Sequence, residues 1–294
     1  MASGYRISRF LYVTYSKYSI LRQSTKHVLC LRQCSLGYTS IASQESDDDA
    51  DRLETGKLQS NYPGHIPTTL FQKALLAVGS AGMSLYNPAR DDMISVMGET
   101  TGYFALRWMR EKMLKDPTGK QILEEKPVIN TKTVSIPELG NLPEGTFGKE
   151  YWKFLSTNGF SPDSRMAVQF VDDPDLMYVM LRYRQVHDLL HTLLGMPTNM
   201  LGEIVVKWVE ALQTGLPMCA LGALGGPIRL RPVHRNQYLN IYLPWALKTG
   251  YNAKFLMAVY FEKHWEQDLD EFQRELNIQP APKPIKKTGK RTLS

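Results

Sequence analysis

Apolar residues recur every three to four positions over most of the chain from about residue 62 to residue 277, the spacing of one face of an α-helix. This pattern predicts helices over 68–85, 100–115 and 147–155. Pro and Gly are frequent over 123–148, so we expect a long irregular connection there, with one weak strand signal at 134–136. The sequence therefore predicts an all-α fold, a multi-helix globular domain over residues 62–278.

Two further helices are predicted in succession after residue 172. Asp173 followed by Pro174 is a helix start signal, a capping Asp before Pro at the first helical position. The first helix ends at Leu194, before a glycine, and Thr198 is the expected cap of the second, which extends to Gly215. Because the connection is short, we expect the two helices to form an antiparallel hairpin.

The two ends of the chain differ in composition from this helical part. Residues 1–44 contain six Lys and Arg, no Asp or Glu, and many Ser, which is typical of a mitochondrial transit peptide; the alternative is a basic arm that binds nucleic acid. Residues 45–61 are predicted to be an acidic disordered linker and residues 279–294 a basic disordered tail. The tail either contacts anionic lipid headgroups or keeps the protein soluble.

Charge, cysteine content and hydropathy argue against a nucleic-acid-binding protein, a disulfide-bonded protein and a membrane-spanning protein. The net charge is +6, but without residues 1–44 the chain has 29 basic and 29 acidic residues, so no nucleic-acid footprint is predicted. Of the three cysteines only Cys219 lies outside residues 1–44, which fits a reducing compartment. No apolar run of about 18 residues is free of charges and helix breakers, so no transmembrane helix is expected.

Candidate chemistry concentrates in the pattern H-D-x-x-H-x11-E on the two helices of the predicted hairpin. Histidines four residues apart, His187 and His191, project from one helix face, as in the H-E-x-x-H metalloproteases. With a rise of about 1.5 Å per residue, the hairpin places Glu203 level with His191 and leaves Asp188 within reach. His187, Asp188, His191 and Glu203 are therefore candidate metal ligands. Arg184, one turn before Asp188, is a candidate neighbour that orients it.

Spacing alone leaves other interpretations open. The two histidines could form a polar stripe, Asp188 could pair only with Arg184, and Glu203 could be an ordinary acidic residue of a first helical turn. The glycines at 222, 225 and 226 follow no predicted strand, so we interpret them as a flexible connector and not as a nucleotide-binding loop. The apolar segment 216–221 is a candidate wall of a lipid-binding groove.

Together with several other segments, the motif resembles the mitochondrial coenzyme Q biosynthesis protein 4 family. The resemblance covers roughly residues 62–278, and its hallmark is the H-D-x-x-H-x11-E pattern, which this chain matches throughout. The other segments are Tyr62-Pro63-Gly64-His65, Gly98-Glu99-Thr100-Thr101-Gly102, Gly145-Thr146-Phe147-Gly148, Tyr178 to Arg184, Gly215-Leu216-Pro217-Met218 and Leu243-Pro244-Trp245-Ala246.

This resemblance implies an all-α protein, peripheral to the matrix side of the mitochondrial inner membrane, in a complex with other coenzyme Q biosynthesis proteins. It implies zinc on His187, Asp188, His191 and Glu203. The implied reaction is C1 decarboxylation of 4-hydroxy-3-methoxy-5-polyprenylbenzoate, coupled to hydroxylation of that carbon. Zinc has no redox chemistry, and two histidines with a carboxylate are also the ligands of non-haem iron oxygenases, so iron stays a candidate.

Three hypotheses therefore stand at this point. The first is a metal-dependent lyase that acts on the polyprenylated benzoate, with Asp188 as a ligand or, in a variant, as a general base. The alternative is a non-catalytic lipid-binding scaffold that organises the ubiquinone-synthesis complex. A metallophosphohydrolase is disfavoured because such sites use more histidines than this chain has to spare. The Leu and Met content is also compatible with a homodimer.

Overall fold

The computed structural model describes residues 59–87 and 90–282. The predicted transit peptide, most of the predicted linker and most of the predicted tail lie outside these ranges. Contacts divide the chain after Gln59, and the unit that begins at Ser60 holds every described helix. No strand occurs within the described ranges, where one isolated bridge joins Thr146 to Asp268. The all-α prediction is confirmed.

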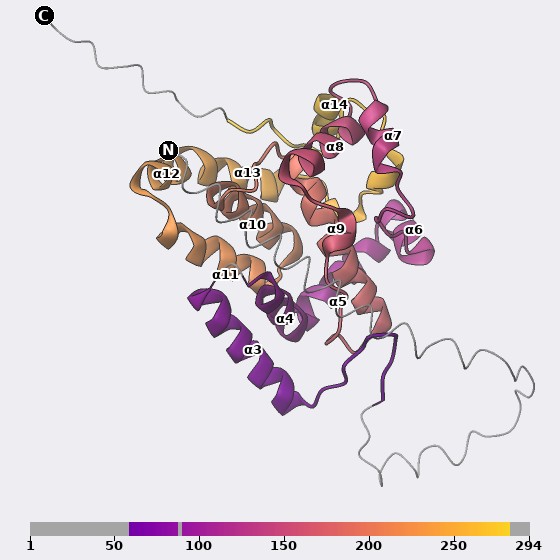
Figure 1. The fold of residues 1–294 in the computed structure, drawn as a ribbon, viewed down its shortest axis with the longest axis vertical. Coiled ribbons are helices and arrows are strands. Elements are labelled where there is room, and N and C mark those ends of the chain that lie inside the picture. The colour runs from indigo at the N-terminus through magenta and orange to yellow at the C-terminus, as the bar shows by residue number, and fades with distance from the viewer. Residues whose placement is uncertain (1–58, 88–89, 283–294) are drawn as a thin grey trace, which may run out of the picture. The chain divides into compact units, whose positions relative to one another are not determined.

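The described helices keep the labels of Figure 1. The α-helices are α3 (Leu70–Tyr86), α4 (Asp91–Thr101), α5 (Tyr103–Leu114), α6 (Pro117–Glu125), α7 (Ile136–Asn141), α8 (Phe147–Asn158), α9 (Pro174–Leu193), α10 (Met200–Thr214), α11 (Pro217–Gly225), α12 (Pro232–Gln237), α13 (Leu243–Asn252) and α14 (Leu269–Glu275). Shorter turns are η1 (Pro162–Ser164), η2 (Gly226–Arg229), the π-helical η3 (Tyr238–Tyr242), η4 (Leu256–Ala258) and η5 (Phe261–Lys263).

Several predicted boundaries are confirmed and others are wrong. Thr69 caps α3 in a capping box, as the start signal near 68 indicates. The predicted helix over 100–115 is instead divided at Gly102 into α4 and α5. Asp116, which we interpreted as marking the end of a helix, lies just past α5 and caps a further helix through the amides of Thr118 and Gly119, so the sequence interpretation missed α6. The weak strand at 134–136 is wrong, because Ile136 begins α7.

The hairpin region also needs two corrections. The cap of α10 is Asn199, whose side chain accepts from Gly202 N at 3.0 Å, whereas the Thr198 hydroxyl donates to Asn158 at 2.7 Å. The glycines after residue 221 are not a flexible connector, since α11 extends through Gly225. The end of α9 is as predicted, with Gly195 in the left-handed region at φ 62°.

Helix α9 lies at the centre of the described helices, with packing partners that include α5, α8 and α10 (Figure 1). From Leu176 to Leu193 it is buried almost throughout, including Val179, Leu189 and Leu193 at 0% exposure. A helix buried on all sides must find partners for its charged side chains, because an unpaired buried charge is costly. The buried arginines of α9 meet this requirement through ion pairs, Arg182 with Glu262 and Arg184 with Glu99. Among the described helices none is long and apolar enough to cross a bilayer.

Candidate metal centre

Two histidines of α9 and one glutamate of α10 meet inside the protein. The His187 and His191 rings lie edge to face with their centroids 4.9 Å apart. Glu203 lies in the first turn of α10 and places one carboxylate oxygen 3.6 Å from His187 Nε2 and the other 3.4 Å from His191 Nε2. One ligand atom from each residue lies within 4.8 Å of the other two. We call these three residues the His–His–Glu cluster.

The other nitrogen of each ring is already bound. His191 Nδ1 lies 3.0 Å from the carbonyl oxygen of Met196, which only accepts hydrogen bonds, so Nδ1 carries the proton. His187 Nδ1 lies 2.6 Å from a carboxylate oxygen of Glu210 and donates to it. Both rings therefore turn Nε2 toward Glu203, the arrangement in which a second partner fixes the tautomer of a metal-binding histidine.

The cluster fits a cation. His191 Nε2 is buried and has no hydrogen-bond partner among the described residues, although a carboxylate lies near it. Burial acts to raise the pKa of Glu203, but the charges of His191 and His187 outweigh burial and lower that pKa well below its usual value. An imidazole lone pair and an ionised carboxylate repel each other unless a proton or a metal ion lies between them. The Glu203 side chain is 37% exposed, so the cluster is open to solvent on the glutamate side.

Asp188 does not join this group of ligand atoms. Its carboxylate is bound by the guanidinium of Arg165, with Nε at 3.3 Å and Nη2 in closer contact. Arg184, expected beside Asp188, instead pairs with Glu99 and donates to the carbonyl oxygen of Met166 at 2.9 Å. The structure thus brings together three of the four predicted ligands and gives the fourth a different partner.

Glu210 is a further site residue that the sequence interpretation missed. It is fully buried, and its carboxylate accepts from His187, from Lys207 Nζ at 2.6 Å and from the Tyr183 hydroxyl at 2.9 Å. Burial acts to raise the pKa of Glu210, but the charges of His187 and Lys207 outweigh it and lower the pKa far below the usual value. Glu210 is therefore an ionised carboxylate that orients His187. The sequence contained a signal for Glu210, because residues 203, 207 and 210 share one face of the predicted helix.

An aromatic side chain covers the other side of the cluster. The Phe154 ring of α8 stacks on His191, with centroids 5.6 Å apart and planes inclined by 21°. This contact and the Met196 hydrogen bond hold the ring from two sides. The cluster is thus supported by α8, α9 and α10 and does not depend on a loop alone.

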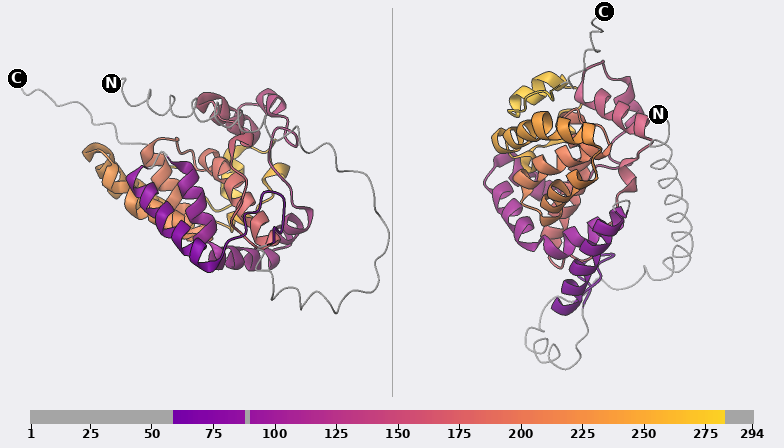
Figure 2. Two further views of the ribbon diagram at one scale, coloured as in Figure 1. Left: turned by 60° about the horizontal axis from the view of Figure 1, so that its bottom comes forward. Right: turned by 90° about the vertical axis from the view of Figure 1, so that its left-hand side faces the viewer.

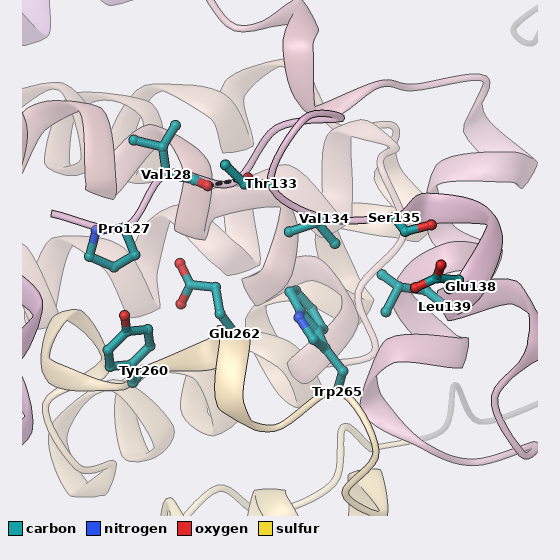
Figure 3. A pocket seen from close by; sticks show the side chains of 10 residues that line it. All are labelled: Pro127, Val128, Thr133, Val134, Ser135, Glu138, Leu139, Tyr260, Glu262 and Trp265. Carbon is teal, nitrogen blue, oxygen red and sulfur yellow. Dashed lines mark hydrogen bonds between the residues drawn. The ribbon is translucent and has the colours of Figure 1, made fainter. Parts of the chain in front are cut away.

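The pocket in Figure 3 lies elsewhere. It has a volume of about 460 Å³, and its lining includes Tyr260, Trp265 and Glu138 but no residue of the His–His–Glu cluster. Glu262, which also lines it, binds the buried Arg182 through both carboxylate oxygens.

Comparison with known proteins identifies the family. A family model described as Coenzyme Q (ubiquinone) biosynthesis protein Coq4 matches residues 62–282. The chain belongs to this family. This Coq4 family member therefore has a role in coenzyme Q biosynthesis.

Named relatives agree with that assignment. The chain is 56% identical over 224 residues to "Ubiquinone biosynthesis protein COQ4 homolog, mitochondrial" of Rattus norvegicus, covering 76% of this chain and 84% of the relative. Identity to the Homo sapiens protein of the same name is 53% over 221 residues, covering 75% and 83%. A crystal structure from Nostoc punctiforme, provisionally described as a ubiquinone biosynthesis protein, has a TM-score of 0.55 at 18% identity and covers 70% of this chain and 96% of that one. It supports the fold alone.

Proposed function

We propose that this Coq4 family member is a mitochondrial, metal-dependent carboxy-lyase of ubiquinone biosynthesis. Its substrate would be 4-hydroxy-3-methoxy-5-polyprenylbenzoate, which loses its C1 carboxyl as that carbon is hydroxylated. It would act with other coenzyme Q biosynthesis proteins, peripheral to the matrix side of the inner membrane. The observation that supports the proposal most is the pair of Nε2 atoms of His187 and His191, turned toward Glu203 by partners on the opposite ring nitrogens.

These three residues would hold zinc or, in its place, ferrous iron. When bound, the ion would supply a Lewis acid for the phenol or carboxylate oxygen of the substrate. Asp188 is the fourth proposed ligand, and its recruitment would break its ion pair with Arg165. The guanidinium of Arg165 would then be positioned to bind the substrate carboxylate, a pairing that planar guanidinium groups favour.

The reaction follows from the substrate's own substitution pattern. The carboxyl group is para to a phenol, so loss of the phenolic proton directs electron density onto the carbon that bears the carboxyl. A balanced oxidative route consumes one dioxygen for each CO2 released and yields the ring quinone and one water. Zinc does not exchange electrons, so with zinc the electrons that reduce dioxygen come from the ring. Lys207 and Glu210 would keep His187 oriented through the reaction.

Release of a carboxyl label tests this proposal. The full chain is loaded with zinc or with ferrous iron and given, in air, a short-prenyl substrate labelled at the carboxyl carbon. We expect metal-dependent labelled CO2 that falls more than about 100-fold in His187→Ala. The matched control is His264→Ala, a histidine outside the cluster that bonds to Gln267. No release with either metal, from folded protein that still binds the lipid, would contradict the enzyme and favour the lipid-binding scaffold.

A further inference from the structure

Helix α3 exposes most of its large apolar side chains, and the one residue that it buries is polar. Its one buried residue is Ser80, and the partly buried Lys73 pairs with Asp172. Leu70 is 88% exposed, Phe71 78% and Val78 74%. A surface helix ordinarily turns its apolar face toward the core. The exposed large apolar residues of α3 are Leu70, Phe71, Leu75, Val78, Met83, Leu85 and Tyr86, a third of the 21 among the described residues.

A second exposed apolar segment adjoins the C-terminal end of α3. The guanidinium of Arg229 in η2 donates to the carbonyl oxygen of Leu85. A Cβ placed on Gly225 of α11 would lie 3.9 Å from the Leu85 side chain. Figures 1 and 2 show α3 beside α4, with its end near α11. The exposed apolar residues of this second segment are Leu221, Leu224, Ile228 and Val233.

The charged side chains of α3 itself and of the second segment are all basic. Helix α3 contains no Asp or Glu, and none occurs from residue 211 to residue 261, a stretch with five Lys and Arg. Arg229, Arg231 and Arg235 are exposed, and none of them forms a salt bridge within the described residues. Near α3, the carboxylates of Asp172 and Asp92 are each paired with a basic residue.

We propose that α3, together with the segment 221–235, is the surface on which this protein lies on an anionic phospholipid bilayer. Apolar side chains on an amphipathic helix, with cationic groups beside them, are the combination that binds a helix in the plane of a lipid headgroup layer. Exposed Tyr86, at the C-terminal end of α3, is a residue type enriched in that layer, and exposed Phe71, near the other end, is typical of the apolar face of such a helix. The exposed arginines Arg229, Arg231 and Arg235 match the charge of anionic headgroups.

A lipid-binding surface fits the proposed function, because a substrate with a polyprenyl tail resides in a membrane. In this one respect the inference rests on the proposed function. Helix α3 packs on α4. Glu99 of α4 pairs with Arg184 of α9, the helix that carries both histidines of the cluster. The proposed lipid-facing helix is thus joined through α4 to the candidate metal centre.

Vesicle flotation tests the surface. The full chain is mixed with phosphatidylcholine vesicles, with or without about 20% phosphatidylglycerol. The variant Phe71→Gln/Val78→Gln is compared with Phe104→Gln/Tyr251→Gln, whose residues are 80% and 85% exposed on α5 and α13. We expect the α3 variant to bind anionic vesicles roughly 10- to 100-fold more weakly, and the control variant to bind as the unmodified chain does. Arg231→Gln is expected to weaken binding to anionic vesicles alone, whereas Lys120→Gln on α6 has no effect.

The readouts separate this proposal from the proposed function. All proteins carry the same basic termini, so a difference between variants reports the substituted surface. Metal content is measured on the same samples and is expected to stay constant, since α3 holds no residue of the cluster. Equal vesicle binding by both double variants would overturn the proposal whatever the turnover. So would a stable dimer in sedimentation velocity that Phe71→Gln/Val78→Gln dissociates, because a second copy would then cover α3.

Discussion

The buried carboxylate of Glu210 offers a direct perturbation of the site that leaves every proposed ligand in place. In Glu210→Gln the side chain keeps its size and one acceptor oxygen but loses its charge. The hydrogen bond to His187 Nδ1, 2.6 Å long in the structure, becomes a bond to a neutral amide. Lys207 Nζ, 2.6 Å from the same carboxylate, loses its counter-ion. The weaker hydrogen bond to His187 and the lost ion pair with Lys207 both follow from removal of the Glu210 charge.

Two magnitudes follow from these contacts. Replacement of an outer partner of a metal-binding histidine lowers metal affinity about 10- to 100-fold. Removal of one member of a buried ion pair costs about 3–5 kcal/mol of stability, because it leaves the other charge uncompensated. Since the Lys207 side chain is 18% exposed and partly solvated, we expect a loss near the lower end of that range.

Competition with a chromophoric chelator measures the zinc affinity, and urea unfolding of the metal-free protein measures the stability. The matched control is Glu262→Gln, which removes the counter-ion of the buried Arg182. It is expected to destabilise the fold without changing zinc affinity. If Glu210→Gln bound zinc as tightly as the unmodified chain, the assigned role of Glu210 in orienting His187 would be refuted.

Three further predictions concern the surroundings of the site. Gly202→Ala is expected to lower the free energy of unfolding by about 2 kcal/mol or more and to weaken zinc binding, because its Cβ would clash with the Pro197 carbonyl. Urea unfolding and chelator competition measure both effects. Gly222→Ala is the tolerated control, because a Cβ there would have its nearest neighbours 3.5 Å away or more. Burial, aided by the charge of Glu210, raises the pKa of the Cys219 thiol to about 12. We therefore expect alkylation of Cys219 at pH 8 to require unfolding, and the free energy of unfolding to fall as the pH rises from about 9 toward 12. Iodoacetamide labelling of a variant in which Cys30 and Cys34 are replaced by Ser tests this, and fast labelling of the native protein would contradict it. If Asp188 leaves Arg165 to bind the metal ion, Asp188→Asn is expected to weaken zinc binding about tenfold. A zinc affinity equal to that of the unmodified chain, measured by chelator competition, would show that Asp188 is not a ligand.

The sequence predicted the long helices and missed short ones. Helix α9 was predictable because Asp173 and Pro174 fix its start and Gly195 its end, and both signals act locally. Helices α6, α7 and α11 were missed because Pro and Gly in those stretches were interpreted as breaks. In each, Pro stands at the first or second helical position, where its missing amide hydrogen costs nothing.

The site was predictable to the extent that it lies on α9 and α10. A spacing of four residues brings His187 and His191 to one face, and a short turn brings Glu203 to them. The partners of Asp188 and Arg184 were not predictable, because Arg165 and Glu99 come from segments whose approach depends on tertiary packing. Helical spacing on α10 would have revealed Glu210, had that helix face been followed two turns beyond Glu203.

X-ray absorption at the zinc edge of the purified full chain tests most directly whether His187, His191 and Glu203 hold one metal ion. We expect one zinc per chain, nitrogen and oxygen ligands at about 2.0–2.1 Å, and the outer-shell scattering of two imidazoles. In His191→Ala one imidazole should be lost, whereas the His264→Ala spectrum should be unchanged. Sulfur in the first shell, or a spectrum that His191→Ala leaves unaltered, would contradict the assigned metal centre.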